Sequence, residues 1–150
     1  VAYDPYVTAP PTGFDDVRLV TLDELLAASD FITIHIPKTS ETAGLIGAEA
    51  LTKVKPSVRI INAARGGVLD EDALLAALRS GKIAGASLDV FDVEPLPVDN
   101  PLWREPNVIV TPHHAGQSDV YNEQVYEIFG PNMKCYLEGR VEAMRNLVPH

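Results

Sequence analysis

Four short runs of β-branched and apolar residues recur along the sequence, and this recurrence narrows the possible folds more than any other feature. The runs cover residues 31–36, 58–62, 85–90 and 108–111, and each contains or meets a polar residue, glycine or proline at its carboxyl end. Strands that are apolar at nearly every position are typical of a parallel sheet, whose two faces are both buried. Stretches long enough for helices separate the first three runs. The alternation predicts an α/β fold with a parallel sheet and helices on both faces.

Helix-start signals lie between the predicted strands. Thr21 and Glu24 have capping-box spacing ahead of an apolar pair, so a helix should begin there. Acidic residues 70–72 precede a second apolar helical pattern, which Gly81 can close. A third helix is expected over about residues 48–55, because Pro56 disfavours helical geometry in the residue before it.

The sequence changes character after residue 118. From residue 119 the apolar positions recur with helical spacing, until Gly130 and Pro131 interrupt them. A kink or two separate helices are expected at that point, followed by a short extended tail at 146–149. We therefore expect one domain at 1–118 and a helical segment at 119–150.

Composition excludes several classes of function. The 150 residues contain 12 Lys and Arg against 21 Asp and Glu, and the net charge of −9 disfavours nucleic acids and anionic membranes as partners. No apolar run approaches the roughly 20 residues that span a bilayer, and no signal peptide opens the chain. Cys135 is the single cysteine, so no internal disulfide forms, which fits a soluble protein of the reducing cytoplasm.

Ligands of an open parallel sheet bind beyond the carboxyl ends of its strands, so the residues that follow each run are candidates for a site. Residues 1–4 resemble the end of a strand with Asp4 at its tip. A carboxylate there can accept hydrogen bonds from a ribose diol and repel a 2′-phosphate. The alternative is an ordinary turn, because Asp followed by Pro often starts one.

Arg65 follows the second run among small residues and ahead of Gly66 and Gly67. The small neighbours let a flat ligand approach, and a guanidinium can hold a carboxylate through two parallel hydrogen bonds while stabilising charge on an adjacent carbonyl. The alternative is a surface arginine that pairs with Asp70 or Glu71.

Acids and histidines follow the last two runs. Asp89, Asp92 and Glu94 come after the third run, and His113 and His114 after the fourth. A carboxylate favours the imidazolium form of a neighbouring histidine, which can then deliver a proton to a developing alkoxide. Adjacent histidines at a strand end point in opposite directions, so at most one of them should reach the same site. A metal site is the alternative, although no third ligand has a typical spacing.

Five motifs in one order resemble the D-isomer-specific 2-hydroxyacid dehydrogenases. They span residues 3–5, 35–42, 62–70, 88–95 and 111–116. The resemblance implies an NAD-binding Rossmann-type doubly wound sheet followed by C-terminal helices, acting on a small 2-keto or 2-hydroxy acid. It also implies that Arg65 binds the substrate carboxylate, that Glu94 holds and charges the histidine, and that His113 donates and accepts the proton.

The same resemblance implies a set of cofactor contacts. Asp4 would bind the adenosine ribose and favour NAD over NADP. The other implied contacts run along the cofactor from the loop after the first run to the last motif: Ile36, Thr42, Ala63, Ala64, Arg65, Asp89, His113 and Gly116. No metal is implied, and a homodimer is expected because relatives commonly pair through this domain.

One departure from the family is large. The glycine-rich phosphate loop G-x-G-x-x-G should precede the Asp4 strand, and the sequence has no such motif. The resemblance therefore implies a Rossmann domain incomplete at its N-terminus, inactive alone and dependent on an N-terminal segment of the same enzyme. The alternative function is a non-catalytic NAD(H)-sensing module of the corepressor type.

Overall fold

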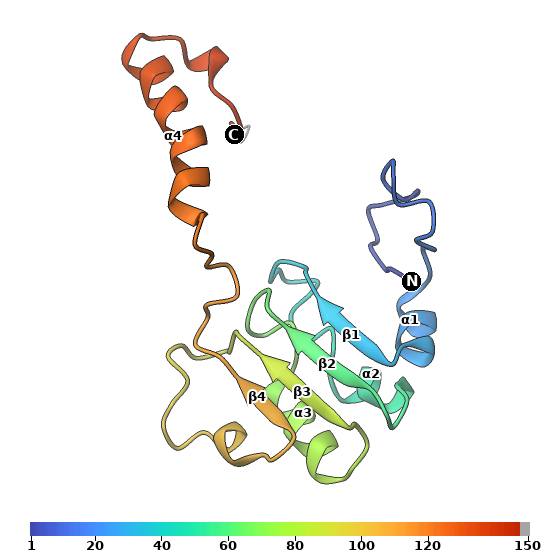
Figure 1. Ribbon diagram of the computed structural model, residues 1–150. Helices are drawn as coiled ribbons and strands as arrows, with labels where there is room; N and C mark the ends of the chain where they lie inside the picture. The colour runs from blue at the N-terminus through green and yellow to red at the C-terminus, as the bar shows by residue number, and fades with distance from the viewer. Residues whose placement is uncertain (148–150) are drawn as a thin grey trace. The chain divides into compact units, whose positions relative to one another are not determined.

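A parallel four-stranded sheet forms the centre of the computed structural model, which describes residues 1–147. Its strands are β1 (Phe31–Ile34), β2 (Arg59–Asn62), β3 (Gly85–Leu88) and β4 (Val108–Val110), arranged in the order β1-β2-β3-β4 (Figure 1). The predicted parallel α/β fold is confirmed, and every strand is shorter than the apolar run that predicted it. The chain divides into two compact units, residues 1–115 and the residues from 116 onward.

Three helices of the first unit lie along one face of the sheet. They are α1 (Leu22–Ala28), α2 (Ala48–Lys53) and α3 (Glu71–Arg79) (Figure 1). α1 packs on α2 and α2 packs on α3. Their buried side chains form a continuous core with the strand side chains that point toward them, including Leu26, Leu51, Leu74 and Ile60. This burial against apolar neighbours, rather than intrinsic helix propensity, stabilises such short helices.

The opposite sheet face has no helix from residues 1–115 over it, whereas the sequence suggested helices on both faces. Phe31 and Ile109 are exposed on this face, and Arg59 Cζ lies over the Phe31 ring, 6.0 Å from the ring centroid. Strand order explains the difference. Each connection from β1 to β3 leads to the next strand on the same side, so right-handed crossovers put their helices on one face.

The predicted start of α1 and both predicted ends of α3 agree with the structure. Thr21 and Glu24 form the expected capping box, in which Glu24 Oε2 accepts the Thr21 amide at 2.9 Å. Asp70 caps α3 by accepting the Ala73 amide at 2.9 Å, and Gly81 follows with a positive φ of 71°. α2 ends at Lys53, two residues earlier than the sequence suggested.

The predicted strand at residues 1–4 is reduced to a single parallel bridge between Ala2 and Leu19. The Ala2 amide donates to Arg18 O at 3.0 Å, and the Val20 amide donates to Ala2 O at 2.9 Å. A longer ladder needs a continuous strand on each side, and residues 3–6 instead turn away. The strand prediction at this position is therefore wrong beyond one residue pair.

The second unit contains α4 (Tyr121–Leu137), one uninterrupted helix that includes Gly130 and Pro131, followed by a short 3-10 turn at Val141–Ala143. The sequence predicted a kink or two separate helices, and the alternative of two separate helices is wrong. Pro131 lacks the N–H that would bond to Glu127 O, the carbonyl four residues earlier. The Arg145 guanidinium donates to that carbonyl instead, at 2.5 Å, and so satisfies it.

Asn132 fixes Arg145 for this contact. The Asn132 amide donates to Arg145 O at 2.9 Å, and Asn132 Oδ1 accepts the Arg145 N–H at 2.8 Å. The expected tail at 146–149 extends into residues outside those that the structure describes. Within residues 1–147, no helix is both long and apolar enough to cross a membrane.

Candidate active site

The loops after the four strands share one edge of the sheet, because the strands are parallel and adjacent. They cover residues 35–42, 62–67, 89–95 and 111–115. The structure thereby brings the predicted site residues Arg65, Glu94 and His113 to neighbouring loops. Gly116 is the first residue of the second unit.

Glu94 and His113 form a direct pair. Glu94 Oε2 lies 2.7 Å from His113 Nδ1, while Glu94 Oε1 accepts the Phe91 amide at 2.9 Å. Hydrogen bonds from His113 and from the Phe91 amide hold the pKa of the Glu94 carboxyl below its ordinary value, so Glu94 is ionised near neutral pH. With Nδ1 on the carboxylate, Nε2 at the other edge of the ring is available to a substrate. The arrangement can donate and accept a proton.

Asp89 holds the loop that carries His113. Asp89 Oδ1 accepts the Thr111 hydroxyl and the His114 amide, the latter at 2.9 Å, and Oδ2 accepts the Ala115 amide at 2.8 Å. Burial acts to raise the pKa of Asp89, but these hydrogen bonds outweigh it and keep the pKa below its ordinary value. His113 between these contacts has a positive φ of 56°. Such a backbone is uncommon outside glycine and needs support from its surroundings.

Sequence reasoning missed this function of Asp89. Strand-end geometry alone did not say which of the two histidines reaches the site, and the choice of His113 rested on the family resemblance. In the structure His113 reaches Glu94 with its ring, whereas His114 contributes its backbone amide to Asp89. Among residues 1–147, no group of three His, Cys, Asp or Glu side chains is placed to hold a metal ion.

Arg65 is exposed beside this pair of loops. Asn62, which is buried, shapes the turn by donating to Arg65 O at 3.1 Å and accepting the Ala64 amide at 3.2 Å. The alternative partners are engaged elsewhere, since Asp70 caps α3 and Glu71 accepts the Asp92 amide at 2.6 Å. The Arg65 guanidinium donates to Ala64 O at 2.6 Å. No described carboxylate forms an ion pair with Arg65, so its charge can serve a ligand.

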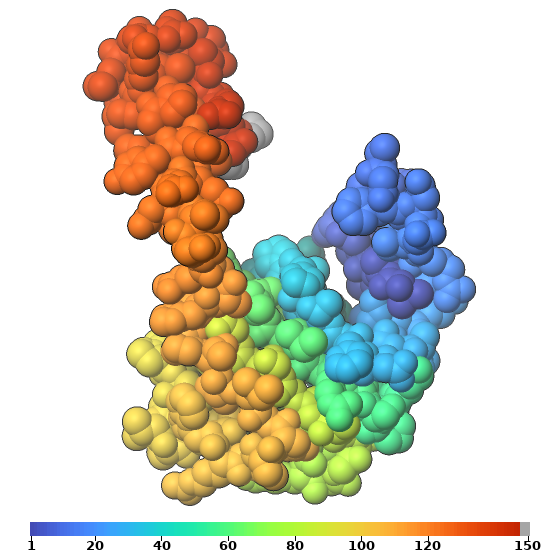
Figure 2. All heavy atoms as spheres, in the orientation of Figure 1, coloured from blue at the N-terminus to red at the C-terminus, as the bar shows by residue number. Residues whose placement is uncertain are grey.

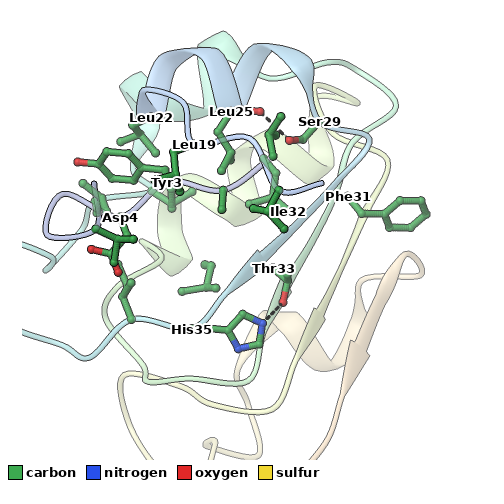
Figure 3. A pocket seen from close by; sticks show the side chains of 18 of the residues that line it. Tyr3, Asp4, Leu19, Leu22, Leu25, Ser29, Phe31, Ile32, Thr33 and His35 are labelled. Carbon is green, nitrogen blue, oxygen red and sulfur yellow. Dashed lines mark hydrogen bonds between the residues drawn. The ribbon is translucent and has the colours of Figure 1, made fainter. Parts of the chain in front are cut away.

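A cavity of about 440 Å³ separates the N-terminal residues from the outer edge of β1. Figure 2 shows the hollow beside the dark blue N-terminal residues, and Figure 3 shows its lining, which includes Asp4, Leu19, Ile32 and His35. His35 Nε2 lies 2.7 Å from the Thr33 hydroxyl. Most of the other lining side chains are apolar.

Two of the predicted cofactor residues, Asp4 and Ile36, line this cavity. Asp4 Oδ1 accepts the Tyr6 amide at 2.8 Å, which is the turn geometry considered as the alternative, and its second oxygen remains able to accept. The Thr42 hydroxyl donates to Pro37 O at 2.7 Å and so closes the loop after β1.

A second cavity, of about 400 Å³, lies against Glu94 and His113. Phe91, Leu96 and Trp103 supply apolar walls. The Trp103 indole N–H donates to Pro97 O at 2.9 Å, which fixes the ring in the loop before β4. The Glu94–His113 pair is therefore bordered by apolar surface.

The Glu94–His113 pair should make stability depend on pH in acid. Because the folded-state pKa of Glu94 is lowered, its stabilising contribution is present above the unfolded-state pKa and is lost as the pH falls through the folded-state pKa. Urea unfolding of the wild type and of Glu94→Gln should therefore differ most near pH 7, and the difference should shrink below about pH 4. A difference that stays constant down to pH 3 would show that Glu94 is not ionised in this pair.

Comparison with known proteins places the chain among relatives of one family. Residues 1–115 match the family model described as D-isomer specific 2-hydroxyacid dehydrogenase, NAD binding domain. A D-3-phosphoglycerate dehydrogenase of Mycobacterium leprae is 54% identical over 113 residues, which are 75% of this chain and 21% of that protein. A glyoxylate reductase of Korarchaeum cryptofilum is 41% identical over 83% of this chain and 38% of its own length.

A solved structure supports the same relationship. The D-isomer specific 2-hydroxyacid dehydrogenase of Xanthobacter autotrophicus Py2, crystallised with NADPH and MES, superposes with a TM-score of 0.74 at 44% identity. The match covers 85% of this chain and 40% of that one. This chain thus spans about a fifth of the length of the D-3-phosphoglycerate dehydrogenase and less than half of the crystallised enzyme. The chain belongs to the D-isomer specific 2-hydroxyacid dehydrogenase family, and residues 1–115 belong to the nicotinamide dinucleotide-binding domain of that family.

Proposed function

We propose that the protein containing this chain interconverts a D-2-hydroxy acid and its 2-keto acid with NAD. The Glu94–His113 pair carries the proposal, because a carboxylate-held histidine at 2.7 Å is suited to proton transfer. Arg65 on the adjacent loop, without an acidic partner among the described residues, supplies the cation that a 2-keto acid requires. The activity of its relatives is consistent with this reaction.

Each residue has a definite role in the proposed reaction. Arg65 binds the substrate carboxylate and stabilises negative charge on the adjacent carbonyl oxygen. His113 Nε2 delivers a proton to that oxygen during reduction and removes it during oxidation, while Glu94 stabilises the imidazolium. NAD, when bound, carries the hydride that is exchanged with substrate C2.

The residues around the sheet edge fit a dinucleotide. Ala63 and Ala64 leave little side chain between β2 and a flat nicotinamide ring. Asp4 is exposed, and its carboxylate would accept hydrogen bonds from a ribose diol and repel a 2′-phosphate, which favours NAD over NADP. In this proposal Ile36, Thr42, Asp89 and Gly116 complete the cofactor contacts.

We also propose that a further segment of the same protein completes this domain. The outer edge of β1 pairs with no described strand, and the apolar cavity beside it separates β1 from the Ala2–Leu19 bridge. A parallel strand in this position would satisfy the open edge. On this view residues 1–118 are part of the NAD-binding domain, and 119–150 return toward a substrate domain. We expect a cytoplasmic homodimer that is inactive when reduced to these residues.

NADH oxidation by the protein at its natural length tests the proposal. The substrates are glyoxylate, hydroxypyruvate, pyruvate and 3-phosphohydroxypyruvate. We expect turnover of at least one, and Arg65→Ala should lower kcat/KM by about 100-fold or more, the typical cost of losing a group that stabilises an oxyanion. Arg59→Ala, on the exposed sheet face, is the matched control and should leave kcat/KM unchanged. NADH binding without turnover of any acid would favour the sensing module instead.

A further inference from the structure

Three charged residues from distant parts of the chain meet at the segment that carries Glu94. Lys38, in the loop after β1, places Nζ 3.3 Å from Asp92 Oδ1. Glu71, at the start of α3, accepts the Asp92 backbone amide on Oε1 at 2.6 Å. Asp92 is therefore held through its side chain by one element and through its backbone by another. We call Lys38, Glu71 and Asp92 the brace.

The loop that carries Arg65 packs directly against residues 91–92. A Cβ added to Gly66 would lie 1.9 Å from Phe91 O, so the two backbones are in direct contact. A Cβ added to Gly67 would lie 2.1 Å from Lys38 Nζ and 2.5 Å from Asp92 Oδ1. The Lys38–Asp92 ion pair thus crosses directly over Gly67, and only glycine leaves room for it.

Asp92 lies only two residues before Glu94 in the chain. Phe91 donates its amide to Glu94 Oε1 at 2.9 Å, immediately before the braced Asp92. A displacement of residues 91–92 would therefore move both Glu94 and the wall against which the Arg65 loop packs. We propose that Lys38, Glu71 and Asp92 are positioning residues that keep Arg65 and the Glu94–His113 pair in their relative geometry. This inference rests on the proposed function.

Charge explains why the brace needs its lysine. Glu71 and Asp92 are adjacent acids, and Asp70 and Asp72 lie near Glu71. Burial, followed by the charges of Asp92, Asp72 and Asp70, raises the pKa of Glu71 despite the hydrogen bond from the Asp92 amide. Lys38 is the cation that contacts this group. Its removal would leave Asp92 and Glu71 to repel each other.

The test uses the protein at its natural length and steady-state kinetics. Lys38→Met and Asp92→Asn should each lower kcat by about threefold to fivefold, the upper range for a half-exposed ion pair, while the Kd of NADH stays unchanged. The double variant should be no slower than the slower single variant, because both remove one contact. Lys55→Met is the matched control. It breaks the Lys55–Asp30 pair at the opposite ends of the strands and should leave kcat unchanged.

Charge reversal and amide exchange provide independent readouts. Lys38→Asp combined with Asp92→Lys should recover most of the lost kcat, and Asp92→Asn should accelerate hydrogen exchange at the Phe91 amide. The inference would be overturned by any of three results. The losses in kcat of the two single variants could add in the double variant, charge reversal could fail to recover kcat, or Lys38→Met could leave kcat as unchanged as Lys55→Met does. If the wild type turns over no 2-keto acid, the proposed function fails, but the hydrogen-exchange rate of the Phe91 amide still tests whether Asp92 holds this segment. An exchange rate in Asp92→Asn equal to that of the wild type would then show that it does not.

Discussion

Replacing His113 with asparagine should lower kcat by about 100-fold to 10,000-fold, the range typical of a lost general acid. The asparagine amide can still donate to Glu94 Oε2, which lies 2.7 Å from His113 Nδ1, so the surrounding loop should keep its position. It has no proton to deliver to a developing alkoxide at neutral pH. The Kd of NADH should therefore remain close to the wild-type value, and stopped-flow NADH oxidation should locate the defect in the chemical step.

His114→Asn is the control for this experiment. His114 contributes its backbone amide to Asp89, and that amide persists when the side chain changes. We expect a kcat close to wild type for this variant. Equal losses for the two histidine variants would mean that the loop conformation, and not proton transfer by His113, limits the rate.

Asp89→Ala should have the largest effect on stability. Asp89 is 5% exposed, and its loss would leave the Thr111 hydroxyl and the His114 and Ala115 amides without their acceptor. A buried donor left unpaired costs about 1–3 kcal/mol, and the three groups can regain part of this from water. We expect the free energy of unfolding to fall by about 2–4 kcal/mol in urea denaturation.

Thr111→Val serves as the matched control for Asp89. It removes one of the three hydrogen bonds and keeps the shape of the side chain, so the loss should be near 1 kcal/mol. Asp89→Ala should also broaden the His113 signals in NMR spectra, because the loop that supports its positive φ is released. If Asp89→Ala lowers the free energy of unfolding no more than Thr111→Val does, the claim that Asp89 stabilises this loop through three hydrogen bonds is contradicted.

Local sequence signals predicted helix starts and strands well where the interacting residues are close together in the chain. The Thr21–Glu24 capping box and the Asp70 cap each join residues three apart, and both are present. The buried strands followed from their apolar composition alone. Parallel order then placed Arg65, Glu94 and His113 on neighbouring loops at one sheet edge.

The features that the sequence did not predict depend on partners far along the chain. Pro131 lies inside α4, and the carbonyl it leaves without a backbone donor, Glu127 O, accepts a hydrogen bond from Arg145, which lies beyond the helix. Asp89 binds amides about 25 residues away, which no local pattern reveals. Residues 1–4 have strand composition, but strand formation depends on a neighbouring strand, and Leu19 provides one bridge only. Long-range hydrogen bonds therefore account for most of the differences.

The most direct test of the proposed chemistry follows the transferred hydride. The protein at its natural length is mixed with NADH carrying deuterium at the transferred C4 position and with the 2-keto acid that it turns over best. We predict that deuterium appears at C2 of the product in the wild type and that its transfer slows by at least about 100-fold in His113→Asn. Bound NADH with no deuterium at C2 of any acid would contradict the assignment of Arg65, Glu94 and His113 as catalytic residues.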